Sequence, residues 1–275
     1  MIKTFDETVL LLQSLKPDCA KCSGLCCTAL FFSKLDGFPE DKSAGTPCTN
    51  LQQDFRCQIH SELDQRKLKG CIGYDCFGAG QHVTQIIYAK ETWRSMPKQA
   101  KEIFDVFLFV FQLYQIRYFL LESLIVSPAA LLKNKIKTLL EENERICRSQ
   151  PSEILAFEME DYRDRANVVL KQVCTLLQES LSHKNKAYPS DFLGRNFANQ
   201  DMSGLDLSTK LLIAAKFNHC NFDGTIFIGA DMRDADLSDA DLRNAVFLTQ
   251  GQINSAKGDK TTKLPSYLDQ PITWK

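Results

Sequence analysis

The C-terminal part of the sequence repeats itself every five residues. Twelve positions in steps of five carry only Phe, Leu or Met, and they are Phe192, Phe197, Met202, Leu207, Leu212, Phe217, Phe222, Phe227, Met232, Leu237, Leu242 and Phe247. Neither a helix nor a strand has this period, because helical side chains recur every 3.6 residues and strand side chains every two. A period of five instead predicts stacked coils in which the bulky residue of each repeat, here called the plug, fills the interior.

Two further positions of the repeat follow rules of their own. The residue before the plug is often Asp or Asn, as at Asp191, Asn196, Asp201, Asp206, Asn221, Asp231, Asp236 and Asp241. The residue two before the plug becomes small, as at Ala215, Cys220, Thr225, Ala230, Ala235, Ala240 and Ala245. The text GADMRDADLSDADLRNAVF obeys all the rules and resembles the pentapeptide-repeat family, whose motif is A(D/N)LXX.

The resemblance covers residues 191–248 and implies a right-handed quadrilateral β-helix with one repeat on each face. Twelve repeats then make about three coils. Leu205 and Lys210 occupy small-residue positions, which predicts a distorted first coil or two. We expect either the preceding helix or residues 187–191 to cover the first coil. The last coil should be covered by a helical turn over 250–256 and by apolar tail residues, namely Leu264, Tyr267, Leu268, Ile272 and Trp274.

The N-terminal region is rich in cysteine. The chain has 11 cysteines. Eight of them lie within 58 residues together with His60, and these candidate metal ligands are Cys19, Cys22, Cys26, Cys27, Cys48, Cys57, His60, Cys71 and Cys76. Thiols two to four residues apart reach one tetrahedral ion from a single tight loop. The text CAKCSGLCC, PCTNL and DFRCQIH resembles a putative zinc- or iron-chelating family with a CxxCxxCC start. That family places two residues where this chain has Ser23, Gly24 and Leu25.

The identity of the metal stays open at this point. Zinc is favoured, because it binds Cys₄ or Cys₃His sets without any redox demand, and an iron–sulfur cluster on four thiolates is the alternative. Adjacent cysteines rarely both bind one small tetrahedral ion, so Cys26 and Cys27 indicate either two metal sites or a bridging thiolate. Disulfides or merely buried thiols are the alternative to metal binding, although the reduced thiols of a cytosolic chain disfavour disulfides. A functional rival makes Cys57 a nucleophile activated by His60, although the same spacing serves metal ligation.

The middle of the chain is helical in its pattern. Apolar residues at spacings of three and four predict a first helix that opens at Met96-Pro97 and ends before Ser127-Pro128. A second is expected up to about Pro151, and a third from Ser152 to about His183. The fold class is therefore mixed, with a metal-pinned cysteine-rich module at 1–94, a helical segment at 95–186 and the solenoid with its cap at 187–275.

Composition narrows the functional classes. The net charge is −1, so no overall field favours nucleic acid. Mimicry of DNA against a topoisomerase is also disfavoured, because the coils are few and Lys210, Lys216, Arg233 and Arg243 interrupt their acidic surface. Asp6 and Glu7 interrupt any export signal. The longest uncharged piece of the most apolar stretch runs from Val106 to Ile116 and is too short to cross a bilayer, which predicts a cytoplasmic protein with no membrane partner.

These observations favour a scaffold or adaptor that contacts an unknown protein partner and carries a metal-binding module. A metal- or iron–sulfur-dependent redox enzyme, or a thiol or metal sensor, is the alternative.

Overall fold

The computed structural model describes residues 4–181 and 188–274. The chain divides into two compact units. The first unit contains Met1–Gln13, Glu122–Lys133 and Val169–Lys275, and the second contains Ser14–Leu121 and Asn134–Val168. The central helical segment contributes to both units. The division at residues 94 and 186, drawn from composition, stays a prediction.

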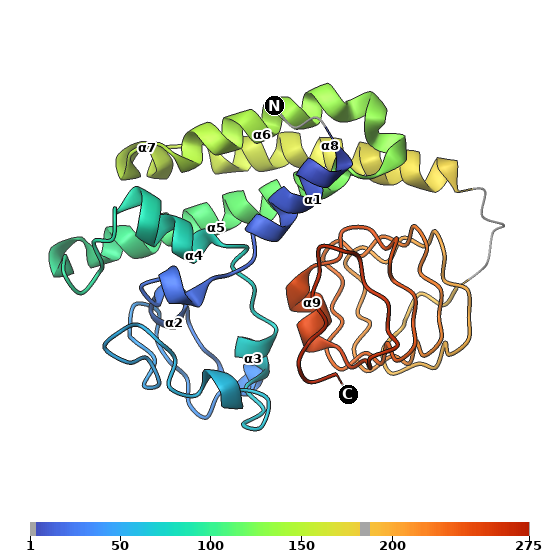
Figure 1. The fold of residues 1–275 in the computed structure, drawn as a ribbon, viewed down its shortest axis with the longest axis horizontal. Coiled ribbons are helices and arrows are strands. Elements are labelled where there is room, and N and C mark those ends of the chain that lie inside the picture. Colours follow the sequence, from blue (N-terminus) through green and yellow to red (C-terminus); the bar gives the residue numbers. More distant parts are fainter. Residues whose placement is uncertain (1–3, 182–187, 275) are drawn as a thin grey trace. The chain divides into compact units, whose positions relative to one another are not determined.

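The pentapeptide region winds into stacked coils, seen in orange and red in Figure 1. Single parallel bridges join residues 20 positions apart, such as Asn196 to Lys216 and Lys216 to Asp236. Backbone hydrogen bonds run in both directions between neighbouring coils, for example from Phe197 N–H to Lys216 O at 2.8 Å. A spacing of 20 residues means four repeats per coil, as the sequence predicts.

The plugs point inward throughout. All twelve are buried, and none exposes more than 4% of its surface. Their rings contact one another from coil to coil and corner to corner, with Phe197 and Phe217 stacked at 5.4 Å. The small residues two before the plugs are buried as well. Cys220 and Thr225 use their side chains to bond the plug carbonyls of the coil before, at 3.1 and 2.8 Å.

The Asp and Asn residues before the plugs cap the turns. In all eight repeats that carry one, a side-chain oxygen accepts a hydrogen bond from the backbone N–H two residues later, at 2.9–3.2 Å. This bond is an Asx turn, which satisfies a backbone donor at each corner. The preference for Asp and Asn therefore has a local physical cause that is independent of any ligand.

The first coils are regular, so the predicted distortion is wrong. Leu205 and Lys210 are half-buried, yet the bridge from Asp206 to Ile226 and the one from Leu211 to Asp231 are both formed. A side chain larger than Ala at the small position can turn toward solvent while the backbone keeps its course. Tyr188 donates to Asp201 O at 2.5 Å and so lies against the first coil. Ala187 lies outside the described residues.

The tail continues the coils before it closes them. Helix α9 (Gln250–Ser255) turns one corner, and Lys257 and Lys263 then add parallel bridges to Asp236 and Asp241. Tyr267, Leu268 and Trp274 are buried, and the Trp274 ring packs on Gly258, where a Cβ would lie 2.7 Å from it. The cap forms as predicted with two departures: Leu264 is half-buried, and Ile272 is fully exposed.

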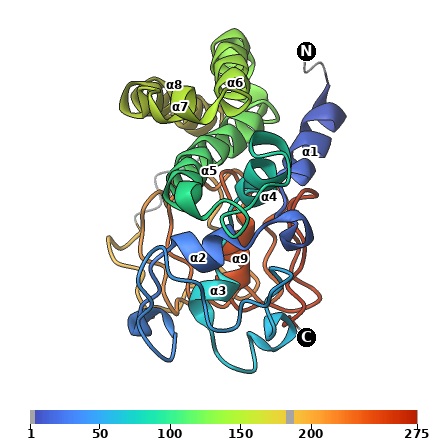
Figure 2. The ribbon, with the colours of Figure 1, turned by 90° about the vertical axis from the view of Figure 1, so that its left-hand side faces the viewer.

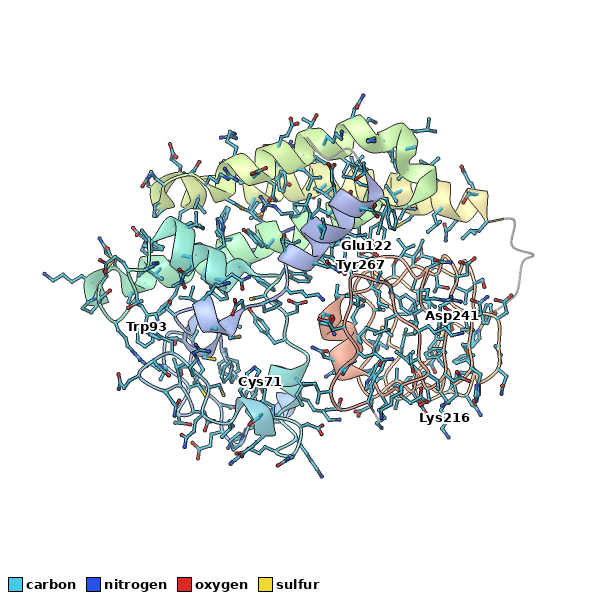
Figure 3. All side chains as sticks on the ribbon, in the orientation of Figure 1. Cys71, Trp93, Glu122, Lys216, Asp241 and Tyr267 are labelled. Carbon is cyan, nitrogen blue, oxygen red and sulfur yellow. The ribbon has the colours of Figure 1, made fainter. Side chains whose placement is uncertain are left out.

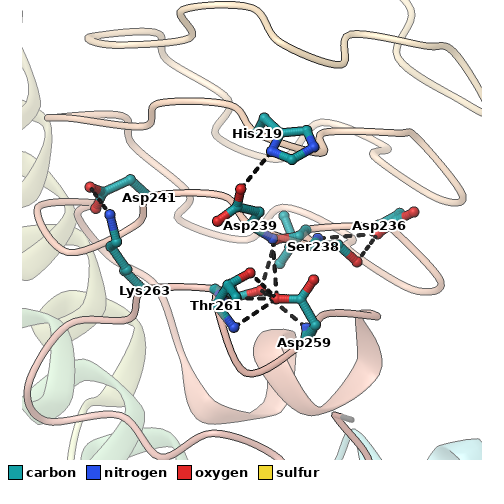
Figure 4. A network of polar contacts seen from close by, with 10 residues as sticks. His219, Asp236, Ser238, Asp239, Asp241, Asp259, Thr261 and Lys263 are labelled. Carbon is teal, nitrogen blue, oxygen red and sulfur yellow. Dashed lines mark hydrogen bonds and ion pairs between the residues drawn. The ribbon is translucent and has the colours of Figure 1, made fainter.

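Polar side chains form ladders along the outside of the last coils (Figure 4). His219 contacts Asp239 on the next coil at 2.6 Å, and the Asp239 N–H bonds to the Asp259 carboxylate of the tail at 3.3 Å. Lys263 pairs with Asp241 at 3.8 Å. These groups are exposed or partly exposed, so each pair contributes little to stability.

The helices follow the predicted order with one difference. The short helix η5 (Pro97–Gln99) leads into α5 (Ala100–Ser123), η6 (Ser127–Leu132) leads into α6 (Lys133–Cys147), and α7 (Pro151–Leu155) precedes α8 (Met159–Ser180). The single third helix expected from Ser152 to His183 is therefore wrong, since the chain breaks between α7 and α8. Phe157 lies at this break and contacts the rings of Phe109 and Tyr162 at 6.4 and 5.6 Å. His183 lies outside the described residues.

A buried asparagine joins three helices of the second unit. Asn143 on α6 donates to Leu113 O of α5 at 2.9 Å and to the Tyr162 hydroxyl of α8 at 3.1 Å. Its own side-chain oxygen accepts from Arg117 Nε at 2.9 Å. Because buried polar groups are costly when unpaired, this bonding fixes the register of the helices.

The helix Pro97–Ser123 is long and apolar enough to cross a membrane by length and composition, and half of its most apolar window is buried inside the protein. Core helices commonly have such a composition. The absence of a membrane partner stays a prediction.

Candidate metal centre

The region from residue 14 to residue 94 has only short elements. They are α2 (Leu25–Ala29), α3 (Lys69–Ile72), α4 (Ala79–His82), the π-helical turn η4 (Val83–Ile87), and the single-turn helices η1 (Cys19–Lys21), η2 (Lys34–Asp36) and η3 (His60–Glu62). Helix α1 (Phe5–Ser14) precedes them. Figure 2 shows long loops between α2 and α3. Two isolated antiparallel bridges, Phe32 to Lys42 and Leu51 to Cys57, are the strand-like pairings that the described residues show here.

The eight predicted cysteines come from four parts of this region. Cys19 begins η1 and Cys22 follows it, and Cys26 and Cys27 lie on α2. Cys48 and Cys57 lie in the following loops, and Cys71 and Cys76 lie on and after α3. Cys76 is buried, Cys19 is exposed, and the other six are intermediate. Figure 3 labels Cys71 within the module.

One group of thiols surrounds Gly80 and Tyr74. A Cβ at residue 80 would lie 2.7 Å from Cys22 Sγ and 3.9 Å from Cys76 Sγ, so only glycine lets both sulfurs approach this backbone. The charges of Cys22 and Cys76 also act on Cys26. The three thiols therefore gather on one side of α4.

A second group gathers around Cys71. The charges that act on its thiol are those of Cys27, Cys48 and Cys57. The backbone helps to hold this group together, since Cys48 N–H bonds to Cys27 O at 2.9 Å. The two groups meet at α2, where the sulfurs of Cys26 and Cys27 lie 3.9 Å apart.

Ligation geometry is incomplete. No set of three or more His, Cys, Asp or Glu side chains within 4–181 and 188–274 is arranged so that it could hold a metal ion. The structure brings the thiols near one another without closing them around a centre. His60 is exposed on η3, and its ligand role stays a prediction.

Burial controls the acidity of these thiols. Burial raises the pKa of Cys19 to about 11 and the pKa values of Cys71 and Cys76 to about 12. Metal-free thiols of this kind are protonated near pH 7, and a bound metal would displace the protons. The contact between the thiols of Cys26 and Cys27 raises the pKa of the first and lowers that of the second.

The rival nucleophile hypothesis gains nothing from the geometry. Burial raises the pKa of Cys57, and the groups acting on it are the Ile59 N–H, Cys27 and Cys48, without the His60 imidazole. An activated cysteine needs a neighbouring base or cation that lowers its pKa.

Two residues that the sequence did not single out support the cluster. Lys42 donates to the carbonyls of Thr28, Leu30, Ser43 and Thr46 at 2.6–3.2 Å, and its charge lowers the pKa of Cys27 further. The Tyr74 hydroxyl is buried without a hydrogen-bond partner among the described residues, close to Cys22, Cys26 and Cys76. No local motif marks either residue, because both act through contacts made after folding.

The unpaired hydroxyl of Tyr74 bears on whether a metal fits the first group of thiols, Cys22, Cys26 and Cys76. A buried hydroxyl without an acceptor is costly, and a metal-bound thiolate is a good acceptor. The donor set is also thiol-rich, as zinc and iron–sulfur clusters prefer. The residues present therefore fit a thiophilic metal on chemical grounds.

Comparison with known proteins identifies the repeat. The family model for pentapeptide repeats matches residues 211–247 with eight copies. The buried plugs extend the same period back to Phe192. The coils are thus those of a pentapeptide-repeat protein. The crystal structure of the pentapeptide repeat protein Rfr23 from the cyanobacterium Cyanothece 51142 is 22% identical, covers 29% of this chain and 67% of its own, and gives a TM-score of 0.24.

A relative covers nearly the whole chain. It is "Uncharacterized protein YybG" of Bacillus subtilis (strain 168), which is 40% identical over 265 residues, 95% of either chain. The chain therefore belongs to the family of YybG. The resemblance of the cysteine-rich region to the chelating family stays a prediction.

Proposed function

We propose that the chain is a non-enzymatic scaffold or adaptor whose coils contact a protein partner. One observation carries the proposal: the twelve plugs fill the interior of the coils, so the side chains available for contact with other molecules lie on the outer surface. Stacked coils present regular side-chain ladders there, such as His219 over Asp239. Repeat proteins commonly use surfaces of this kind for binding. In this proposal the coils form a right-handed quadrilateral β-helix.

The proposal gives the cysteine module a structural metal, with zinc as the first choice. Cys22, Cys26 and Cys76 would hold one ion, and Cys27, Cys48, Cys57 and Cys71 would hold another, with Cys19 at the edge. A structural zinc supplies folding free energy to modules that lack a large core. Metal analysis and an absorption spectrum of protein purified without oxygen distinguish zinc from an iron–sulfur cluster. A colourless zinc protein supports a structural role, and a brown protein with a broad visible band supports the iron–sulfur redox alternative.

Photo-crosslinking in cells tests the adaptor role directly. A photoreactive residue would replace Leu211, Lys216 or Asn221, which are exposed on three successive faces of one coil. We expect one face to give a discrete crosslinked product with one protein. Lys135, exposed on α6, serves as the matched control and should give none. Absence of a discrete product from all three faces would contradict the adaptor role.

A further inference from the structure

A cavity of about 520 Å³ opens in the second compact unit. It lies among α4 and η4, α5 and α6, and all of its lining residues belong to this unit. The basic side chains of Arg117 and Arg148 line it beside the imidazole of His82, and Tyr114 and Ile86 supply apolar surface. A volume of this size suits a small metabolite.

Arg117 has hydrogen-bonding capacity to spare. Its Nε donates to Asn143, and the guanidinium lies over the Tyr114 ring at 4.9 Å from the centroid. These contacts fix the plane of the group. Its Nη2 is buried and has no hydrogen-bond partner among the described residues. A desolvated cationic donor without an acceptor is unusual in a folded protein. Because Nη2 is closed to solvent, an oxyanion in the cavity would meet Arg117 through its other Nη.

Arg148 brings a second positive charge to the same cavity. It pairs with Glu144, also on the wall, at 2.7 Å, and the Arg148 side chain is 71% exposed. An exposed pair of this kind is weak, so an incoming anion can compete for the guanidinium. Both arginines line the same cavity, and their charges act on the pKa values of His82 and Tyr114 there.

His82 is held in a neutral, oriented state. Its Nε2 lies 2.7 Å from the backbone carbonyl of Cys147, so Nε2 carries a hydrogen and donates it. Burial and the two arginines lower the pKa of His82, outweighing its bond to that carbonyl. The positive charge of the cavity therefore comes from the arginines, whose planar forks match carboxylate and phosphate oxygens.

One wall of the cavity is built on an irregular turn. Helix α4 continues into the wider turn η4, which contains Ile86. Wide turns of this kind are rare and are frequent at functional sites. Thr84 on this turn bonds Ser23 N–H at 3.0 Å, so the cavity wall and the cysteine module share one fixed segment.

We propose that this cavity binds a small organic oxyanion, a carboxylate or a phosphate ester. Arg117 and Arg148 hold the charged end, and Tyr114 and Ile86 contact its ring or chain. The cavity residues belong to the second compact unit and the coils to the first, and the site is independent of the adaptor role, since it requires neither a protein partner nor a metal.

Calorimetric titration of the full chain tests the site, with phenyl phosphate and inorganic phosphate as probes at constant ionic strength. We expect saturable binding of phenyl phosphate and weaker binding of inorganic phosphate, which lacks the ring. Arg117→Lys keeps the charge but loses the planar guanidinium, and it should raise the Kd for phenyl phosphate by about tenfold. Arg148→Gln should raise this Kd about fivefold.

Arg145→Gln is the matched control, because Arg145 is exposed on α6, three residues before Arg148, and does not line the cavity. It should leave binding unchanged. Arg117 also donates to Asn143, so circular dichroism must confirm that Arg117→Lys folds. If this variant does not fold, the binding measured for Arg148→Gln tests the proposal. Absence of saturable binding by the unaltered chain, or equal weakening by Arg145→Gln and Arg148→Gln, would overturn the proposal.

Discussion

Glu122 joins the last coil to the tail through a single carboxylate oxygen (Figure 3). Its Oε1 accepts from the Phe247 N–H at 2.5 Å and from the Tyr267 hydroxyl at 2.8 Å, and all three residues belong to the first compact unit. The side chain is buried, and its Oε2 has no hydrogen-bond partner among the described residues. Burial raises the pKa of Glu122 to about 8, although the hydrogen bonds from Tyr267 and the backbone oppose the shift.

This raised pKa predicts a pH dependence of stability. The unfolded chain releases the proton near pH 4.5, while the folded protein keeps it up to about pH 8. The contribution of this group is therefore fully present below pH 4.5 and is lost as the pH rises toward 8, with a slope of about 1.4 kcal/mol per pH unit. Glu122→Gln should remove this slope, as measured by urea unfolding between pH 5 and 8.

Glu179→Gln is the control for that experiment, because Glu179 is exposed in the same compact unit. It should leave the slope unchanged. If the unaltered chain and Glu122→Gln showed the same pH dependence, the carboxyl would already be ionised in the folded protein at neutral pH.

The corners are the elements that shape the coils. The residue two after each plug has a positive φ in ten successive repeats, from Gly194 through Asp239. Each corner is closed by a hydrogen bond from the N–H three residues after the plug to the plug carbonyl, as from Lys210 to Leu207 at 3.1 Å. Gly and Asn adopt such backbone geometry at low cost, whereas a β-branched residue is strained there.

Thr209 is the strained corner. Its φ is 58°, while Asn199 stands at the same repeat position with a φ of 63°. Thr209→Asn should raise the free energy of unfolding by about 1 kcal/mol, because a backbone strain of this kind costs about 1–3 kcal/mol and Asn relieves part of it. Ser208→Asn, one residue earlier in the same turn, should stay within about 0.5 kcal/mol of the unaltered chain. Equal effects of the two substitutions in urea unfolding would show that the corner is relaxed.

The elements differ in how far the sequence could predict them. The plugs were predictable because a bulky apolar residue, Phe, Leu or Met, recurs at a fixed step, and each repeat needs such a side chain to fill the interior. The break between α7 and α8 was not, because Phe157 leaves the helical path to meet Phe109 and Tyr162, which are distant or out of phase in the sequence. The Glu122 contact with Tyr267 spans 145 residues and has no local signal.

At the scale of the whole molecule, two regions are stabilised by different means. The coils combine ladders of backbone hydrogen bonds with buried plugs. The cysteine module has helices of four or five residues, and helices this short are not stable alone in water. The cysteine positions were predictable as a cluster from their spacing. Which thiols become neighbours was not, because Cys22 and Cys76 meet beside Gly80, and Cys71 meets the thiols of another part of the module, only in the fold.

Metal removal should therefore act on one region only. With a thiophilic chelator, we expect proteases to cut between residues 19 and 76 while residues 191–263 stay protected, as read by mass spectrometry of the fragments. Cys71→Ser should lower the metal content per chain and reproduce this cutting without chelator. Cys174→Ser is the matched control, because Cys174 is half-buried on α8 in the other unit, and it should change neither measurement. A native protein that contains no metal, and whose fragments are the same with and without chelator, would contradict the proposed metal centre. The description of the coils would still hold, since nothing in their packing depends on a thiolate.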